Sequence, residues 1–218
     1  MFTESLAAAV SDPFAVMNAV GLVAFAFVGA SKAVREEYDL LGIAIVGLAM
    51  AFAGGTTRDL LVNRVPLVLQ SPVEIGLALV GVALAIGLPL LLDAPDSHPV
   101  TLLADAIGLA AFATAGAIVA TDAGVSAFGV VAIATINAVG GGATADVLLD
   151  RPPFILFEDF YATPAVLGGV TYWATAAVGA AGLAAAACAA VTVGLRLAAV
   201  AYGWRLPTVA DVAVRGGK

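Results

Sequence analysis

Charged residues, and the side chains that carry most enzyme chemistry, are scarce in this sequence. Only 11% of the 218 residues are charged, and there is one cysteine and one histidine. Cys188 lies in an Ala-rich apolar run without a disulfide or metal-binding partner, so we expect a small packing residue. His98 falls in a Pro/Asp-rich segment, where we expect it to be solvated in a loop. Hydrolytic and metal-dependent chemistry therefore have little to work with, and we expect no enzyme, no cofactor and no metal beyond ions in transit.

Apolar residues take the place of the missing charges. Hydrophobic residues make up 62% of the chain and the mean hydropathy is +1.06. A soluble domain carries roughly 25% charged residues, and a core of this size cannot hide so many apolar side chains from water. Several runs also reach the length of about 18 residues that predicts a membrane span. We therefore predict an all-α integral membrane protein surrounded by membrane lipids, with no nucleic-acid partner.

A short glycine motif occurs twice at a fixed spacing. The first copy reads GGTTRDLL over residues 54–61, and the second reads GGGATADVLL over residues 140–149. Asp59 and Asp146 hold the same place in the two copies and lie 87 positions apart. The same offset relates Gly55 to Gly142, Arg64 to Arg151, and Gly21, Phe25 and Gly29 to Gly108, Phe112 and Gly116. The chain is therefore expected to contain an internal repeat.

The repeat predicts the domain organisation. Residues 14–92 hold three apolar runs, of which the second covers about residues 40–61, and a polar and Pro-rich break follows. Residues 101–181 hold three more, and the fifth run of the chain covers about residues 126–149. A seventh helix is expected over residues 183–204. Because each unit has an odd number of spans, the second starts on the opposite side of the membrane from the first. We thus predict seven transmembrane helices, arranged as two three-helix repeats of inverted topology plus a seventh helix.

Basic residues are distributed unequally between the two predicted sides. One side collects Lys32, Arg35, Arg151, Arg205, Arg215 and Lys218, and the other holds only Arg58 and Arg64. Cytoplasmic loops carry the excess of Lys and Arg. We expect a multi-pass protein of the cell (plasma) membrane with its N-terminus outside and its C-terminus in the cytoplasm. The acidic N-terminal segment does not have the pattern of a cleavable signal peptide.

The glycines and charges of the motif predict the functional site. Glycine inside a helix costs about 1 kcal/mol relative to alanine, and weak points at matching positions of two inverted halves indicate a transport site. Irregular backbone at membrane depth is tolerated only where it is buried or lines a water-filled cavity. The candidate pore and gating residues are Gly54, Gly55, Arg58, Asp59, Gly140, Gly141, Gly142 and Asp146. Asp105, Asn137, Arg64 and Arg151 are second-rank candidates for lining the pore.

A charge at membrane depth needs a polar cavity or a partner. Arg58 and Asp59 are adjacent and lie about 100° apart around a helix, so they need not pair with each other. Asp59 could instead pair with a basic residue of the other half, such as Arg151. A packing explanation also stays open. Glycine pairs in membrane helices let neighbouring helices approach closely, and Arg58 and Asp59 would then cap a helix end at the water interface.

The sequence resembles the prokaryotic relatives of the trimeric intracellular cation (TRIC) channels, whose repeat is also described as a glycine transporter domain. The resemblance spans residues 14–207 and rests on the duplicated motif and on RLAAVAYGWRLP over residues 196–207. It implies a homotrimer with one pore per subunit, between second and fifth spans that are kinked at their glycine motifs. Such a pore passes K⁺ and Na⁺. One departure is Ala145, which stands where the resemblance predicts a second Arg.

Two other functions are compatible with the same residues. A secondary transporter of a small zwitterion such as glycine would present the N-terminal dipole of a discontinuous helix to the substrate carboxylate. A membrane scaffold without transport activity would use the glycines for packing alone. Flux measurements separate these alternatives, because a channel gives unitary currents and a carrier saturates.

Overall fold

Helices make up the regular structure of the protein. The computed structural model describes residues 11–92, 98–156 and 160–206, and this part contains seven α-helices, two 3₁₀ turns and no strand. The α-helices are α2 (Pro13–Arg35), α3 (Leu40–Leu61), α4 (Pro72–Leu92), α5 (His98–Asp122), α6 (Ala127–Leu148), α7 (Ala162–Ala177) and α8 (Ala181–Tyr202). The 3₁₀ turns are η1 (Leu67–Leu69) and η2 (Phe154–Leu156). Among the described residues, five helices (α2, α3, α5, α6 and α8) are long and apolar enough to cross a membrane. The prediction of an all-α membrane protein is confirmed.

Local sequence signals set several helix ends. Asp39 accepts a hydrogen bond from the Gly42 amide at 2.7 Å to cap α3, and Ser126 caps α6 in the same way from the Gly129 amide. Gly179, at φ +83°, separates α7 from α8. α7 and α8 are therefore two separate helices, as expected for a distinct seventh helix. We expected His98 to lie in a loop, and this was wrong. It is the first residue of α5, because Pro99 favours the first turn of a helix.

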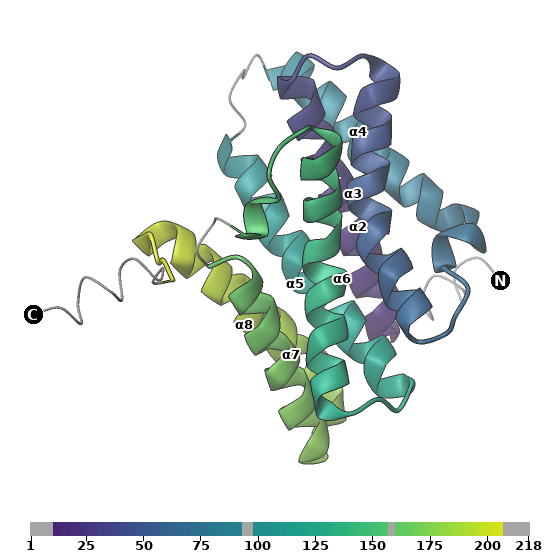
Figure 1. Cartoon of the computed structure of the whole chain (residues 1–218), viewed down its shortest axis with the longest axis vertical. Helices are drawn as coiled ribbons and strands as arrows, with labels where there is room; N and C mark the ends of the chain where they lie inside the picture. Colours follow the sequence, from purple (N-terminus) through teal and green to yellow (C-terminus); the bar gives the residue numbers. More distant parts are fainter. Residues whose placement is uncertain (1–10, 93–97, 157–159, 207–218) are drawn as a thin grey trace, which may run out of the picture.

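The two halves of the chain run in opposite directions. α3 and α6 correspond residue for residue at the 87-position offset, as do η1 and η2. Figure 1 shows the loop between α2 and α3 at the top and the loop between α5 and α6 at the bottom. α2 is therefore antiparallel to α5, and α3 to α6.

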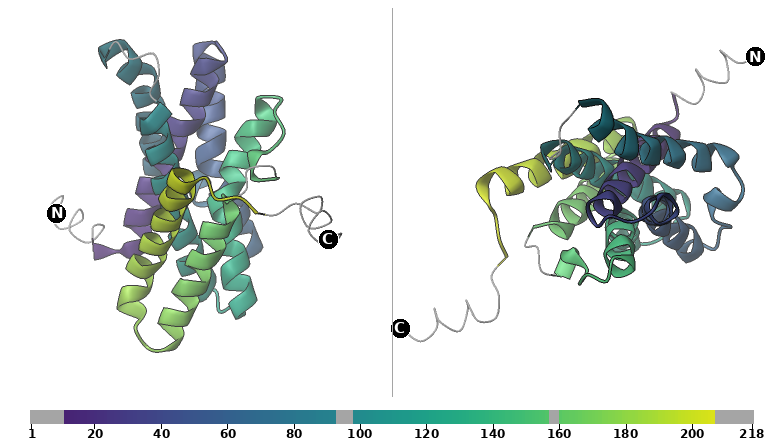
Figure 2. Two further views of the ribbon diagram at one scale, coloured as in Figure 1. Left: turned by 90° about the vertical axis from the view of Figure 1, so that its left-hand side faces the viewer. Right: turned by 90° about the horizontal axis from the view of Figure 1, so that it is seen from above.

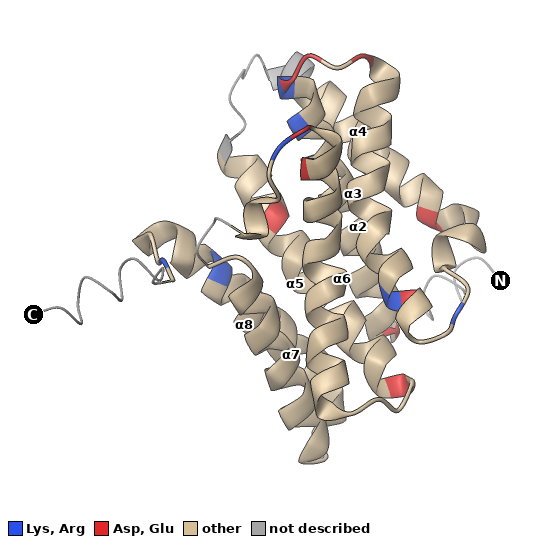
Figure 3. Cartoon of the chain, in the orientation of Figure 1, with Lys and Arg blue, Asp and Glu red and all other residues tan. Residues whose placement is uncertain are grey.

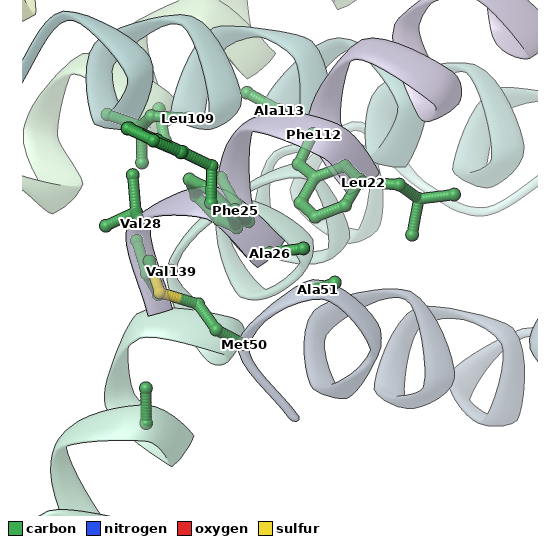
Figure 4. Packing of buried hydrophobic residues seen from close by; sticks show 14 of the residues in the cluster. Leu22, Phe25, Ala26, Val28, Met50, Ala51, Leu109, Phe112, Ala113 and Val139 are labelled. Carbon is green, nitrogen blue, oxygen red and sulfur yellow. The ribbon is translucent and has the colours of Figure 1, made fainter. Parts of the chain in front are cut away.

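Aromatic and glycine residues join the halves at the centre. The rings of Phe25 and Phe112, both labelled in Figure 4, meet edge to face with their centroids 5.1 Å apart. The Phe25 ring lies against Gly108, and the Phe112 ring lies against Gly21. The contact of Phe25 with Gly108 therefore has an equivalent in the contact of Phe112 with Gly21, in which the two halves of the chain are interchanged. All four residues are buried in the core.

α8 has no counterpart in the first half. It forms an antiparallel pair with α7, which the left view of Figure 2 shows, and it also packs along α5. The Thr192 hydroxyl of α8 lies directly against Gly168 of α7. In the first half, α4 packs against α2 and places Gly81 on the α2 backbone at Val23. The seventh helix therefore breaks the internal symmetry on one side of the molecule.

Apolar and polar residues are arranged as a lipid environment requires. Large apolar side chains are exposed on the outer faces of the helices, among them Ile45, Leu79, Val80, Leu84, Leu103, Val166, Leu167 and Val170. Several polar side chains are buried instead, including Arg58, Asp59, Asn137 and Asp146. A soluble protein does the reverse, because water solvates charged groups and excludes apolar ones. The structure therefore agrees with a protein whose outer surface faces lipid.

Candidate functional site

Charged residues gather in two groups near opposite ends of α2, as Figure 3 shows. One group surrounds a cavity of about 340 Å³, here the Lys32 cavity, lined by Lys32, Arg35, Asp105, Asp146, Arg151 and Arg196 together with apolar residues. The other surrounds a cavity of about 480 Å³, here the Arg58 cavity, lined by Asp12, Arg58, Asp59, Arg64, Gln70 and Asp122 together with apolar residues. Of the four second-rank candidates, Asp105, Arg64 and Arg151 each line one of these cavities and Asn137 lines neither. That any of them lines a pore stays a prediction.

The two cavities are built from equivalent positions. Asp146 and Arg151 of the Lys32 cavity correspond to Asp59 and Arg64 of the Arg58 cavity at the 87-position offset. Phe154 corresponds in the same way to Leu67, Lys32 to Val119, and Arg35 to Asp122. The repeat therefore produces one polar cavity toward each end of the molecule, with buried Phe25 and Phe112 between them along α2 and α5.

Asp59 is held by two kinds of donor. Its Oδ1 accepts hydrogen bonds from Arg58 Nε at 2.8 Å and is 2.7 Å from Arg58 Nη2. Its Oδ2 accepts one from the Leu67 amide at 2.9 Å. The chain can turn back to place that amide because Asn63, just after α3, adopts a left-handed conformation with φ 57°. Both carboxylate oxygens are therefore occupied at the end of α3.

This pairing corrects the sequence interpretation. Arg58 and Asp59 do pair, because the long Arg side chain can fold back onto its neighbour where water is excluded and an opposite charge gains most. Arg58 is only 1% exposed. The suggested partner Arg151 pairs with Glu36 instead. The Nη1 atom of Arg58 is buried and has no hydrogen-bond partner among the described residues.

Asp146 is held in the same manner by a residue from the other half. Lys32 Nζ of α2 lies 2.7 Å from Asp146 Oδ1. The Phe154 amide donates to Asp146 Oδ2 at 3.0 Å, and Asp150 takes the left-handed turn with φ 53°. Sequence reasoning used Lys32 only to assign the orientation in the membrane. Lys32 and Asp146 are 114 positions apart, so no local pattern pairs them.

The glycine motifs lie where α3 and α6 cross. A methyl group on Gly54 would overlap the Asn137 carbonyl oxygen, and one on Gly141 would overlap the Met50 carbonyl oxygen. Gly140 also faces the Gly54 backbone. These three glycines allow the backbones of the two helices to approach closely. Met50 and Asn137 are 87 positions apart, as are Gly54 and Gly141. The two glycine contacts are therefore equivalent to each other with the two halves interchanged, as are the contacts of Phe25 and Phe112.

The remaining motif glycines have more room. A methyl group on Gly55 would come no closer than 3.8 Å to an atom of Arg58, and one on Gly142 no closer than 3.7 Å to the Tyr161 hydroxyl. Both α3 and α6 are assigned as continuous α-helix through their motifs. Glycine at 55 and 142 is therefore not required by packing, and a bend at either residue remains a prediction.

Further polar side chains of α5, α6 and α8 are buried or half-buried and make polar contacts inside the protein. Asn137 Nδ2 donates to the Phe112 carbonyl at 2.6 Å, while its Oδ1 is buried without a partner among the described residues. Asp105 accepts a hydrogen bond from the Tyr161 hydroxyl at 2.9 Å and lies 3.6 Å from Arg196 Nη2. Sequence analysis did not select Arg196 for the site. The available signal was a single Arg in the apolar run of the last helix, because a charge there needs a partner.

Comparisons with known proteins agree with this architecture. The glycine transporter family matches the chain twice, at residues 15–89 and 102–177. The UPF0126 membrane protein YvgT of Bacillus subtilis is 37% identical over 71% of this chain and 76% of its own length. The UPF0126 inner membrane protein YadS of Escherichia coli K12 is 32% identical over 89% of this chain and 95% of its own.

Solved structures show the same fold. A TRIC cation channel structure has a TM-score of 0.79 and 35% identity, covering 88% of this chain and 95% of its own. The TRIC trimeric intracellular cation channel orthologue from Rhodobacter sphaeroides has a TM-score of 0.79 and 31% identity, covering 88% and 98%. The chain therefore belongs to the UPF0126 glycine transporter family of membrane proteins, which includes the prokaryotic TRIC channels.

Proposed function

We propose that this chain is a cation channel that assembles as a homotrimer with one pore in each subunit. The pore connects the Lys32 cavity to the Arg58 cavity between α3 and α6, and it passes the monovalent cations K⁺ and Na⁺. The observation that carries this proposal is the pair of equivalent polar cavities, each with a motif carboxylate, on either side of the glycine crossing. The similar solved proteins, which are TRIC cation channels, support the same function.

The arrangement of charges favours the entry of cations, and in this proposal it corresponds to the closed state of the pore. Asp146 and Asp59 line the two cavities, and a ring or pair of carboxylates attracts cations. In the structure, however, each carboxylate already binds a tethered cation, Lys32 or Arg58. A permeating K⁺ or Na⁺ has to compete with that side chain. Opening therefore requires the side chains to release the carboxylates and the crossing at Gly54 and Gly141 to separate.

The membrane arrangement belongs to the same proposal. Residues 14–92 and 101–181 form repeats of inverted topology, and residues 183–204 form the additional helix. The Lys32 cavity faces the cytoplasm of a plasma-membrane protein, because Lys32, Arg35 and Arg151 all lie there. The N-terminus is then outside and the C-terminus inside.

The test is single-channel recording of the purified protein in planar bilayers, with K⁺ and Na⁺ on opposite sides. We expect unitary currents that change in amplitude or open time in Asp146→Asn and Gly55→Ala variants. Asp150→Asn is the matched control. It removes one negative charge four residues away at an exposed position, and Asn tolerates the left-handed conformation found there. Folded wild-type protein that gives no current would overturn the channel proposal.

A carrier of a small zwitterion such as glycine is the second candidate, because the matching family is described as glycine transporter. A discontinuous helix would suit that function, whereas α3 and α6 are continuous through their glycine motifs. Uptake of radiolabelled glycine into protein-containing liposomes separates the two. Saturable uptake without unitary currents would support the carrier over the channel.

A further inference from the structure

The two glycine motifs differ at one chemically important position. Arg58 in the first copy corresponds to Ala145 in the second, so the second motif lacks the cation that binds its own aspartate. Ala145 is fully buried. Asp146 would be left as a buried carboxylate without a counter-charge, which is strongly unfavourable where water is excluded.

Lys32 stands where the missing cation is needed. Its Nζ contacts Oδ1 of Asp146, the same oxygen that Arg58 contacts on Asp59. In both sites the other oxygen accepts the amide of the first residue of a 3₁₀ turn. Both cations also lie over an aromatic ring: Lys32 Nζ is 5.5 Å from the centre of Phe154, and Arg58 Cζ is 5.3 Å from the centre of Phe14. The counterpart of Lys32 itself is the apolar Val119. The cation of the Asp146 site therefore comes from α2, whereas the cation of the Asp59 site comes from the same helix as its aspartate. The contact with the carboxylate is the same in both sites.

We propose that Lys32, supplied across the interface between the two halves, replaces the arginine absent at Ala145 and positions Asp146 in the closed pore. The functional part of this inference rests on the proposed channel. That Lys32 takes the place of an arginine beside Asp146 does not depend on channel activity, because it follows from the contacts of the two carboxylates.

The replacement makes the two ends of the pore unequal. Arg58 presents two nitrogen atoms to Asp59 and its side chain is 2% exposed, whereas Lys32 presents one nitrogen to Asp146 and is 21% exposed. Water screens the Lys32 pair more strongly, and an ammonium lacks the planar fork of a guanidinium. The Asp146 end is therefore the weaker closure, and a cation arriving through the Lys32 cavity displaces its tethered competitor more readily.

A charge transplant tests the proposal. Lys32→Val removes the cation and installs the residue found at the equivalent position of the first half. Lys32→Val with Ala145→Arg then recreates the Val119 and Arg58 pair in the second half. Arg205→Gln is the control, because Arg205 is an exposed basic residue that lines neither the Lys32 cavity nor the Arg58 cavity. The readouts are the thermal unfolding temperature and, in bilayers, the open probability and the ratio of currents at opposite voltages.

Lys32→Val is expected to lower the unfolding temperature and raise the open probability about tenfold, because Asp146 loses its partner in the closed state. The double variant is expected to return both toward wild type and to reduce the difference between the two current directions. Arg205→Gln is expected to leave the open probability unchanged. If Ala145→Arg prevents folding, the reverse transplant, Arg58→Ala with Val119→Lys, tests the same exchange in the first half against Arg58→Ala alone.

Two results would overturn the inference. One is a Lys32→Val protein that matches wild type in both readouts. The other is a folded double variant, from either transplant, that does not improve on its single variant. A wild-type protein without current would refute the channel alone, because the unfolding temperatures of the same variants still decide whether Lys32 substitutes for an arginine at 145.

Discussion

Adjacent glycines in the two motifs are expected to respond oppositely to the same substitution. Alanine at position 54 would place a methyl group into the Asn137 carbonyl oxygen, and alanine at 141 would do the same at Met50. Alanine at 55 or 142 would meet nothing closer than ordinary contact distance. Sequence spacing treats these glycines alike, whereas the crossing of α3 and α6 separates them into two classes.

The change in the free energy of unfolding for each glycine-to-alanine substitution is the sum of a gain in helix stability and a cost of overpacking. Replacing glycine by alanine inside a helix gains about 1 kcal/mol of helix stability. Overpacking against a close neighbour costs about 1–3 kcal/mol, and more where the neighbour is backbone that cannot rotate away. We therefore expect Gly54→Ala to lower the free energy of unfolding by about 1–2 kcal/mol and Gly55→Ala to raise it by up to about 1 kcal/mol.

Thermal unfolding in detergent measures this difference. For a chain of this size, 1 kcal/mol moves the unfolding temperature by about 2–4 °C. Gly54→Ala and Gly141→Ala should unfold below wild type, and Gly55→Ala and Gly142→Ala at or above it. If all four substitutions shifted the temperature in the same direction, the assignment of Gly54 and Gly141 to close backbone packing would be refuted. Reduced opening in a stable Gly55→Ala protein would then report helix bending, since the fold itself is unharmed.

Three further substitutions probe charges and a helix end. Arg58→Met leaves buried Asp59 without its cation and should lower the free energy of unfolding by about 3 kcal/mol, measured by denaturant titration at fixed detergent. Arg151→Gln breaks the exposed pair with Glu36 and should change the same quantity by less than about 1 kcal/mol, so an equal loss in both variants would contradict the burial argument. Gly203→Ala should fray the end of α8, since φ there is +62°, and faster amide hydrogen exchange over the last turn would show it.

Periodicity and length were sufficient for most of the fold. The second apolar run was predicted over residues 40–61, and α3 is Leu40–Leu61. The fifth was predicted over 126–149, and α6 is Ala127–Leu148 with Ser126 as its cap. These helices lie in lipid, where every backbone amide must be satisfied within the helix, so hydrophobic length and helix length coincide. The sequence therefore predicts secondary structure best where the lipid environment allows the backbone only one hydrogen-bonded structure.

The partners of the charges could not be predicted in the same way. The repeat located Asp59 and Asp146, but it could not show that Arg58 folds back on its neighbour or that Lys32 reaches Asp146 from α2. Both depend on side-chain conformation and on how the halves are placed. An 87-position offset gives equivalent positions, and the replacement of Arg by Ala at 145 shows that equivalent positions need not carry equivalent charges.

In the proposed channel, the two equivalent glycine contacts between α3 and α6 limit how the pore can open. Gly54 lies on the Asn137 carbonyl and Gly141 lies on the Met50 carbonyl, so both contacts are made by the same two helices. A displacement of α3 away from α6 weakens the two contacts together, and neither helix can clear the crossing alone while the other contact holds. The tethered cations are placed differently, because Arg58 belongs to α3 and Lys32 to α2. Separating α3 from α6 carries Arg58 along with its own Asp59 but moves Asp146 relative to Lys32. In this proposal the Lys32 pair is therefore broken by the separation of α3 from α6, whereas Arg58 has to release Asp59 by a movement of its own side chain.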